Sequence, residues 1–257
     1  MPRLPANWYL RAVLAERLVV VADAHLGATP PEVEHGLLAF LEAVPCLGDA
    51  LLVNGDLFDF WFSYARVIPR HGFHVAAALA RLRRTVPIIM VGGNHDRWDA
   101  DFWRNDLGVD FAPERARFDL GRRRVLAVHG DGLTEPRWSA ALLHRVISHR
   151  ATAAIYRSLH PDRGFRLVER LAPSLGDKNH GEAAVSAAAE RQQAWAAEAM
   201  RADASVDLLV MGHTHRAALT EIEAGRWYLN PGAWFDGCRY AVVTESGVEL
   251  RQFEVPA

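Results

Sequence analysis

The chain has 257 residues, of which 50% are hydrophobic, with a formal net charge of -2 and a pI of about 6.6. Proteins that coat nucleic acid carry a strongly basic face, and this charge balance gives no sign of one. We therefore expect no nucleic-acid partner. The two cysteines, Cys46 and Cys238, lie far apart and outside any CxxC pattern, which argues against a disulfide framework.

The apolar segments of the chain are too short to cross a membrane. Charged residues Arg11, Glu16 and Arg17 interrupt the first of them, and no other segment approaches the roughly 20 apolar residues that a span requires. We expect a cytoplasmic protein. A peripheral contact with the inner surface of the membrane stays open.

Short apolar runs that predict buried strands alternate with helical patterns in the first half of the chain. The segments 33–44 and 72–84 have helical spacing. Alternation of this kind predicts an α/β fold with a layered sheet core flanked by helices. The strand-like runs are 18–22, 51–53, 88–91, 125–128 and 208–211.

The segment at about 136–204 differs from the rest. It is rich in Ala and Leu, carries many charges, and its apolar residues recur at helical spacing. We expect a single domain over 1–257 with this segment as an all-helical insertion between two strands. The runs at 226–229, 240–244 and 248–253 predict further strands, the last two joined by a hairpin at Ser246-Gly247.

Residues of metal-ligating types follow five of the strand-like runs. Ligands gather at the carboxyl ends of strands in α/β sheets, so the fold would bring these side chains together. After a single strand, Asp or His is more often a cap or turn residue than a ligand. Five clusters favour a metal site, because the alternative needs five independent coincidences. The clusters are Asp23-x-His25, Asp56-x-x-Asp59, Asn94-His95-Asp96, His129-x-Asp131 and His213-x-His215.

The residue types also narrow the choice of metal. Imidazole, carboxylate and amide oxygen ligands without thiolate suit manganese, iron or zinc better than calcium or a structural zinc site. We expect manganese first, with iron or zinc as the alternatives.

Together with their glycines, these clusters resemble the five motifs of calcineurin-like metallophosphoesterases, in the family order. The resemblance implies a sandwich fold and a hydrolase of phosphate esters or anhydrides that uses two divalent ions. It covers residues 23–215. The motifs are Asp23-x-His25, Gly55-Asp56, Gly92-Gly93-Asn94-His95-Asp96, His129-Gly130-Asp131 and Gly212-His213-x-His215.

The resemblance also implies a role for each motif residue. Asp23, His25 and His215 would hold the first ion, Asn94, His129 and His213 the second, and Asp56 would bridge both. A hydroxide between the ions would be the nucleophile, since paired cations lower the pKa of a shared water and neutralise both oxygens of an in-line displacement.

Two residues of the third motif are assigned to catalysis. His95 would sit beside the substrate phosphate with Asn94 and donate a proton to the leaving oxygen, while Asp96 would orient it. Asp59 and Asp131 are expected only to support the site, since each could simply cap a turn or helix.

Three further features resemble the UDP-2,3-diacylglucosamine pyrophosphatases of lipid A synthesis. They are the block 55–61, the helical insertion after His129-Gly130-Asp131, and the turn 230–234. The resemblance implies a lipid-linked sugar nucleotide as partner, with UDP-2,3-diacylglucosamine hydrolysed to UMP and 2,3-diacylglucosamine 1-phosphate. Better known members of this branch carry Arg at the position of His95, where this chain has the general phosphoesterase form.

In that branch the inserted helices form a lid whose apolar side holds two acyl chains. Apolar candidates here could equally pack the inserted helices against one another, and polar candidates could be ordinary solvated side chains. The apolar candidates are Leu142, Val146, Ile155, Leu159, Leu167 and Leu171. The polar candidates, for phosphate or sugar contact, are Tyr156, Arg166, Lys178 and Asn179. The aromatic residues Trp61, Trp98, Phe102 and Trp103 are expected to pack under the metal loops.

Two other functions stay open on the sequence. A phosphodiesterase or phosphomonoesterase of a soluble nucleotide would use the same motifs, but a small polar substrate needs no apolar lid. A catalytically dead scaffold would use the fold for protein binding, and the intact ligand set with His95 argues against it.

Overall fold

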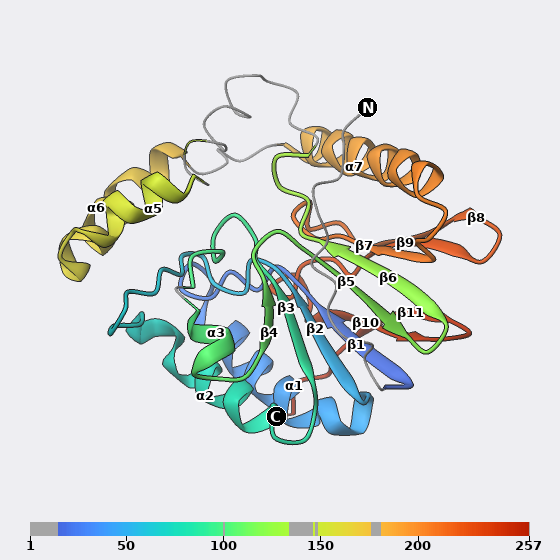
Figure 1. The fold of residues 1–257 in the computed structure, drawn as a ribbon, viewed down its shortest axis with the longest axis horizontal. Helices are drawn as coiled ribbons and strands as arrows, with labels where there is room; N and C mark the ends of the chain where they lie inside the picture. The colour runs from blue at the N-terminus through green and yellow to red at the C-terminus, as the bar shows by residue number, and fades with distance from the viewer. Residues whose placement is uncertain (1–14, 100, 134–145, 147–148, 176–180, 257) are drawn as a thin grey trace.

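The computed structural model describes residues 15–99, 101–133, 146, 149–175 and 181–256, and its strands form two packed sheets (Figure 1). The first sheet contains β1 (Arg17–Val21), β2 (Ala50–Asn54), β3 (Ile88–Val91), β4 (Asp110–Ala112), β10 (Arg239–Thr244) and β11 (Val248–Gln252). The second contains β5 (Arg115–Leu120), β6 (Arg123–Val128), β7 (Leu208–Val210), β8 (Ala218–Glu223) and β9 (Arg226–Asn230). The helices are α1 (Pro31–Leu47), η1 (Arg70–Gly72), α2 (Phe73–Leu82), α3 (Phe102–Asn105), α5 (Arg150–Arg157), α6 (Pro161–Leu175) and α7 (Glu182–Ala202).

Both sheets are parallel at their centres. In the first, ordered β11-β10-β1-β2-β3-β4, the strands β1 to β4 run parallel and β10 is antiparallel to its two neighbours. In the second, ordered β5-β6-β7-β9-β8, the strands β6, β7 and β9 run parallel between antiparallel edges. Parallel neighbours need crossover connections, which α1 and α2 supply between β1, β2 and β3.

Strand β1 shows why the predicted strands are continuous apolar runs. Val19 and Val21 pack into the core beneath α1 and α2, whereas Leu18 and Val20 pack into the core between the two sheets. Successive side chains of a strand point to opposite faces, so a strand with both faces covered needs apolar residues throughout.

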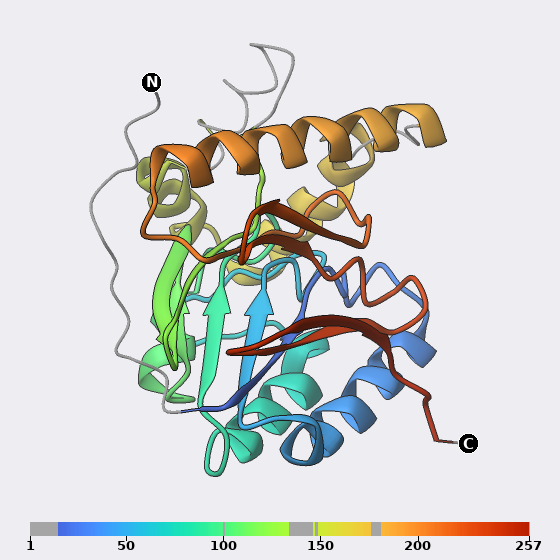
Figure 2. The same cartoon turned by 90° about the vertical axis from the view of Figure 1, so that its right-hand side faces the viewer.

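Helices cover the outer face of each sheet. Figures 1 and 2 show α1 and α2 on the outer side of the first sheet and α7 on the outer side of the second. Ala196 and Met200 of α7 pack against Leu209, Met211 and Tyr228. The result is a four-layered α/β/β/α sandwich, and the predicted α/β fold with a layered sheet core is confirmed.

Helices α5, α6 and α7 lie between β6 and β7 in the sequence. The first two contact the loop after β2: the ring centroids of Tyr156 and Phe62 are 4.4 Å apart, and those of Phe165 and Phe60 are 5.6 Å apart. None of the helices in the described part of the chain combines the length and apolarity that crossing a bilayer requires.

The predicted strands and the helices predicted at 33–44 and 72–84 are present with small shifts at their ends, and the hairpin of β10 and β11 is confirmed. Part of the predicted helical insertion, including Leu142, lies outside the described residues. The sequence analysis missed β4, β5, β8 and α3. Strand β4 is only three residues long and helix α3 only four. Strand β5 carries an alternating pattern of partly exposed and buried residues, which a search for period-two alternation would have found.

Candidate metal centre

Loops at the carboxyl ends of β1, β2, β3, β6 and β7 bring the predicted clusters together. Three groups of side chains each offer ligand atoms within 4.8 Å of one another. Asp56 and His25 each belong to two of these groups. The groups are Asp23, His25 and His215; His25, Asp56 and His95; and Asp56, His129 and His213.

The imidazoles converge on the two carboxylates. His129 Nε2 lies 3.0 Å from Asp56 Oδ2, and His25 Nε2 lies 3.7 Å from the same oxygen. On the other side, His215 Nε2 lies 3.5 Å from Asp23 Oδ1 and 3.2 Å from His25 Nε2. Nitrogen and oxygen donors from both sheets therefore face a common space.

The backbone at these positions is unusual. Among the described residues, seven other than glycine have a positive φ, and five of them are predicted ligands. Side chains with a Cβ rarely adopt this region, and it persists where the surrounding structure enforces it, typically at functional sites. The five are Asp23 (φ 53°), His25 (45°), Asp56 (51°), His213 (68°) and His215 (58°).

Hydrogen bonds between the loops enforce this backbone. The Ala24 and His25 amides donate to the Asp56 carbonyl at 2.9 and 3.0 Å. The His213 amide lies 3.1 Å from both carboxylate oxygens of Asp23, and the His95 amide donates to Asp56 Oδ1 at 3.1 Å. The carboxylates thus organise the loops as well as facing the space between them.

Two buried atoms fit a divalent cation. The His129 ring places Nδ1 2.9 Å from the Asn54 carbonyl, so Nδ1 carries a hydrogen and Nε2 faces the Asp56 carboxylate at 3.0 Å. Within the part of the chain that is described, Asn94 Oδ1 is buried without a hydrogen-bond partner. Buried polar atoms are normally paired, and imidazole, carboxylate and amide oxygen are ligands of divalent transition metals.

Burial and the neighbouring charges shift the pKa values of three predicted ligands. Burial raises the pKa of Asp23 to about 7, although His129 opposes the shift. Burial also disfavours ionised Asp56, yet His129 and His95 hold the pKa of its carboxyl well below its usual range. Burial and the neighbouring His25 lower the pKa of His215 to about 3, which keeps it neutral as a ligand must be. A cation between the carboxylates would relieve their mutual repulsion.

The predicted partner of His95 is wrong in this structure. Both oxygens of Asp96 accept backbone hydrogen bonds, from Leu57 N at 2.7 Å and Gly93 N at 2.8 Å. The ring of His95 instead places Nδ1 against the Asp59 carbonyl and 3.7 Å from Asp59 Oδ1. Asp96 therefore fixes the loops on either side, whereas Asp59 orients His95 and also lies 3.7 Å from His25 Nδ1.

Some of the residues predicted to pack under the metal loops or to support them are found there. Trp61 and Trp103 are fully buried, with ring centroids 4.7 Å apart, beneath the loop that carries Asp56. Asp131 forms an ion pair with Arg97, which holds the loops after β3 and β6 together.

The substrate-binding candidates on the inserted helices differ in burial, and two of them are not described. Tyr156 packs its ring on Phe62 and Phe60, and its hydroxyl is buried beside that of Tyr64. Arg166 is exposed. Lys178 and Asn179 lie outside the described residues. Of the apolar candidates, Ile155 is 69% exposed and Leu159 36% exposed.

One aromatic residue beside the centre escaped the sequence analysis. Phe235 follows the turn 230–234, and its ring centroid lies 5.0 Å from that of His215 and 5.7 Å from that of His25. It is 38% exposed, so its ring borders the open side of the two imidazoles. Its position directly after a predicted motif was the available signal.

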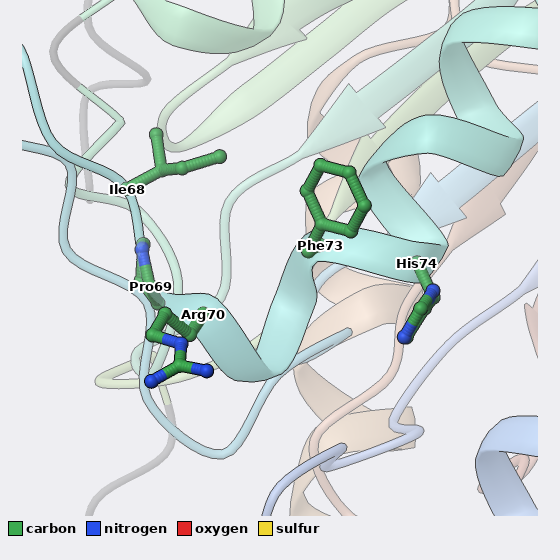
Figure 3. Close-up of a pocket in the computed structure, with 5 residues that line it drawn as sticks. All are labelled: Ile68, Pro69, Arg70, Phe73 and His74. Atoms are coloured by element: carbon green, nitrogen blue, oxygen red, sulfur yellow. The ribbon is translucent and has the colours of Figure 1, made fainter.

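A separate surface pocket of about 340 Å³ lies at the start of α2. Figure 3 shows Ile68, Pro69 and Arg70 on the segment before the helix, and Phe73 and His74 on its first turn. None of these five residues is a predicted ligand, so this pocket is distinct from the cluster of imidazoles and carboxylates.

Gly93 tests the placement of the Asp56 carboxylate. A Cβ on Gly93 would lie 2.0 Å from Asp56 Oδ1 and 2.6 Å from Asp56 N, so the carboxylate or the loop must move. Gly93→Ala should lower the affinity of the chain for Mn²⁺ by roughly 10- to 100-fold, the usual scale for a displaced ligand environment. The measurement is calorimetric titration of metal-stripped protein.

Gly181→Ala is the matched control, since a Cβ there meets nothing within 4 Å. Wild-type affinity in Gly93→Ala would show that Asp56 does not lie where the structure places it.

Comparison with known proteins agrees with this site. A family model described as calcineurin-like phosphoesterase matches residues 16–217. The UDP-2,3-diacylglucosamine hydrolase of Sodalis glossinidius is 28% identical over 91% of this chain and 96% of its own, and that of Serratia proteamaculans is 28% identical over 91% and 97%. The solved structure of Yfce, a phosphoesterase from Escherichia coli, aligns with a TM-score of 0.42 and 14% identity, covering 93% of this chain and 100% of that one.

Because the family model spans most of the chain and the loops bring its motifs together, this protein belongs to the calcineurin-like phosphoesterase family and is a metal-dependent hydrolase.

Proposed function

We propose that the chain hydrolyses the pyrophosphate bond of UDP-2,3-diacylglucosamine, giving UMP and 2,3-diacylglucosamine 1-phosphate. One observation carries the proposal. Helices α5 and α6 present exposed apolar residues, and both helices contact the loop after β2 that carries Asp56 and Asp59. A lipid with a polar head would need apolar and ionic surfaces side by side. The names of the two relatives point to the same substrate.

We assign the ligands of two divalent ions to the converging side chains. Asp23, His25 and His215 would hold one ion, and Asn94, His129 and His213 the other, with Asp56 shared between them. Bound metal would supply an activated water and would neutralise the phosphate oxygens during in-line displacement. Manganese fits the donor set, and iron or zinc would fit it as well.

The role that we propose for His95 follows from its contacts. Because its Nδ1 lies against the Asp59 carbonyl, Nδ1 carries a hydrogen and Nε2 is the nitrogen available to a substrate. A third of its side chain is exposed, so Nε2 can reach a bound phosphate and exchange a proton with the leaving oxygen. Asn94, the preceding residue, would share the phosphate.

We propose that α5 and α6 act as a lid for the acyl chains within an insertion at about 136–204 of a single domain. Ile155, Leu159 and Leu167 are 69%, 36% and 43% exposed, so the protein core does not use these apolar side chains. Tyr156 and Arg166 would approach the sugar or phosphate, as would Lys178 and Asn179 from the following segment. Such a substrate resides in a bilayer, so we expect a cytoplasmic protein with peripheral contact at the inner membrane surface.

Release of UMP from UDP-2,3-diacylglucosamine tests the substrate directly. Purified wild-type chain should release UMP, and it should carry two transition-metal ions by elemental analysis. Asp56→Ala should lose one or both ions and all turnover, because its carboxylate is shared, whereas Asp110→Ala at the exposed start of β4 should change neither.

A mutant at Asp56 with two ions and full turnover would overturn the metal assignment. A wild-type chain that cleaves bis-para-nitrophenyl phosphate but not the lipid would favour a soluble phosphodiester as substrate. Metal-loaded protein that is inactive on both would favour a scaffold.

His95→Ala separates catalysis from metal binding. If His95 serves the leaving group, turnover should fall by roughly 10²- to 10⁴-fold, the usual scale of general acid catalysis, while metal content stays at the wild-type level. His74→Ala, an exposed histidine of α2, is the control and should retain full turnover. Loss of metal in His95→Ala would make His95 a ligand, as its membership of one ligand group allows.

The lid is tested with two charged substitutions. The double mutant Ile155→Asp and Leu159→Asp should lose cleavage of the lipid, since each buried methylene of an acyl chain contributes about 0.8 kcal/mol. Hydrolysis of bis-para-nitrophenyl phosphate should be unchanged. Leu250→Asp, on β11 and 38% exposed, is the control and should leave both activities intact.

Equal loss of both activities in the double mutant would show that these helices only support the fold. Undiminished cleavage of the lipid would show that the acyl chains bind elsewhere.

A further inference from the structure

Gln192 is a polar residue in the buried row of α7. Ala196 and Met200 follow it at intervals of four residues, and all three are fully buried. A buried amide costs free energy unless its donors and acceptor are satisfied. An apolar residue would suit this position for packing alone, so the partners of Gln192 must explain its presence.

Those partners all lie around one loop of the metal centre. Gln192 Nε2 donates to the Gly212 carbonyl at 3.0 Å, and Gln192 Oε1 accepts from Thr214 Oγ1 at 2.9 Å. The same oxygen accepts from Tyr228 Oη at 3.1 Å and from Asn230 Nδ2 at 3.3 Å. Gly212 and Thr214 flank His213, and Thr214 directly precedes His215.

The loop 212–215 carries two predicted ligands whose backbone is strained. His213 and His215 both have left-handed backbone conformations, which strain a residue that carries a Cβ. Two of the hydrogen bonds of Gln192 hold the residues on either side of His213. The loop is thus held from the side of α7 as well as by Asp23, which accepts from the His213 amide.

The loop after β6 closes on the same amide. A Cβ on Gly130 would lie 2.2 Å from Gln192 Nε2, so the chain just after His129 passes directly over it. Asn230 adds a second tie, since its Nδ2 also donates to the Gly212 carbonyl and to Thr214 Oγ1. Gln192 therefore lies behind three predicted ligands of the second sheet, His129, His213 and His215, without contacting the ligand atoms.

We propose that Gln192 is a positioning residue that fixes the 212–215 loop so that His213 and His215 hold their metal ions. This inference rests on the metal centre of the proposed function. The inference adds that α7, the last helix before β7, contributes to the affinity of the centre for metal ions through the side-chain amide of Gln192.

The experiment compares Gln192→Met with Gln193→Met in the full chain. Gln193 is the neighbouring residue, is only partly buried, and has no hydrogen bond from its side chain among the described residues. Metal-stripped protein is titrated with Mn²⁺ by calorimetry. Gln192→Met should bind roughly 10- to 100-fold more weakly, the usual loss when a group that orients ligands is removed, and Gln193→Met should match wild type.

Amide hydrogen exchange separates positioning from a general loss of stability. In metal-free Gln192→Met, the amides of Gly212, His213 and Thr214 should exchange faster while those of β6 and β7 keep wild-type protection. Uniformly faster exchange, or equal weakening in Gln193→Met, would overturn the proposal, because the affinity would then follow the stability of the whole sandwich.

Tyr228→Phe and Gln192→Glu serve if Gln192→Met does not fold. Tyr228→Phe removes one donor to Gln192 Oε1 with little change in volume and should weaken Mn²⁺ binding by a few-fold. Gln192→Glu keeps the acceptor oxygen but replaces the donor to the Gly212 carbonyl by a carboxylate oxygen, so it should also weaken Mn²⁺ binding at neutral pH. Wild-type Mn²⁺ affinity in these variants would overturn the proposal. A wild-type chain that binds no Mn²⁺ would instead overturn the metal centre, before any substitution is compared.

Discussion

Two carboxylates buried side by side, Asp23 and Asp56, constrain everything around them. Both are almost completely buried at the ends of adjacent parallel strands, so their charges can be balanced only by groups that the fold brings to them. The structure supplies imidazoles from both sheets and backbone amides from the loops after β3 and β7. Five of the predicted ligands have a left-handed backbone, which lets their side chains face one point, and the glycines at 93 and 212 leave the room that the two carboxylates occupy.

The two sheets of the sandwich contribute different side chains to the centre. Loops of the first sheet provide the carboxylates, the amide of Asn94 and the ring of His25, and loops of the second sheet provide His129, His213 and His215. The core between the sheets, which includes Leu18, Val20 and Val210, therefore sets the distance between the two halves of the centre. The helices pack on the outer faces and support the sheets that carry these loops, α1 and α2 behind the first sheet and α7 behind the second (Figures 1 and 2).

The sequence predicted the α/β layers and the convergence of the five clusters because both depend on local signals. A strand with two covered faces is a continuous apolar run, and a ligand that follows such a strand is visible beside it. Contacts between distant segments have no such signal. The pairing of His95 with Asp59 across 36 residues was missed, and Asp96 was given that role because it is adjacent in the sequence. Gln192 was missed for the same reason, since a glutamine in an Ala-rich helix is ordinarily a solvated residue.

The split of ligands between the sheets also links binding to folding. A ligand set drawn from one sheet alone would be preformed in that sheet, whereas this set exists only when both sheets are packed in register. Any ion that binds the packed state and not the separated one stabilises the packed state by mass action. The ion pair of Arg97 with Asp131 joins a loop of the first sheet to a loop of the second, so it too forms only when the sheets are packed. The free energy of packing the two sheets and the free energy of binding metal are thus coupled. The coupling arises because packing the sheets is what buries Asp23 and Asp56.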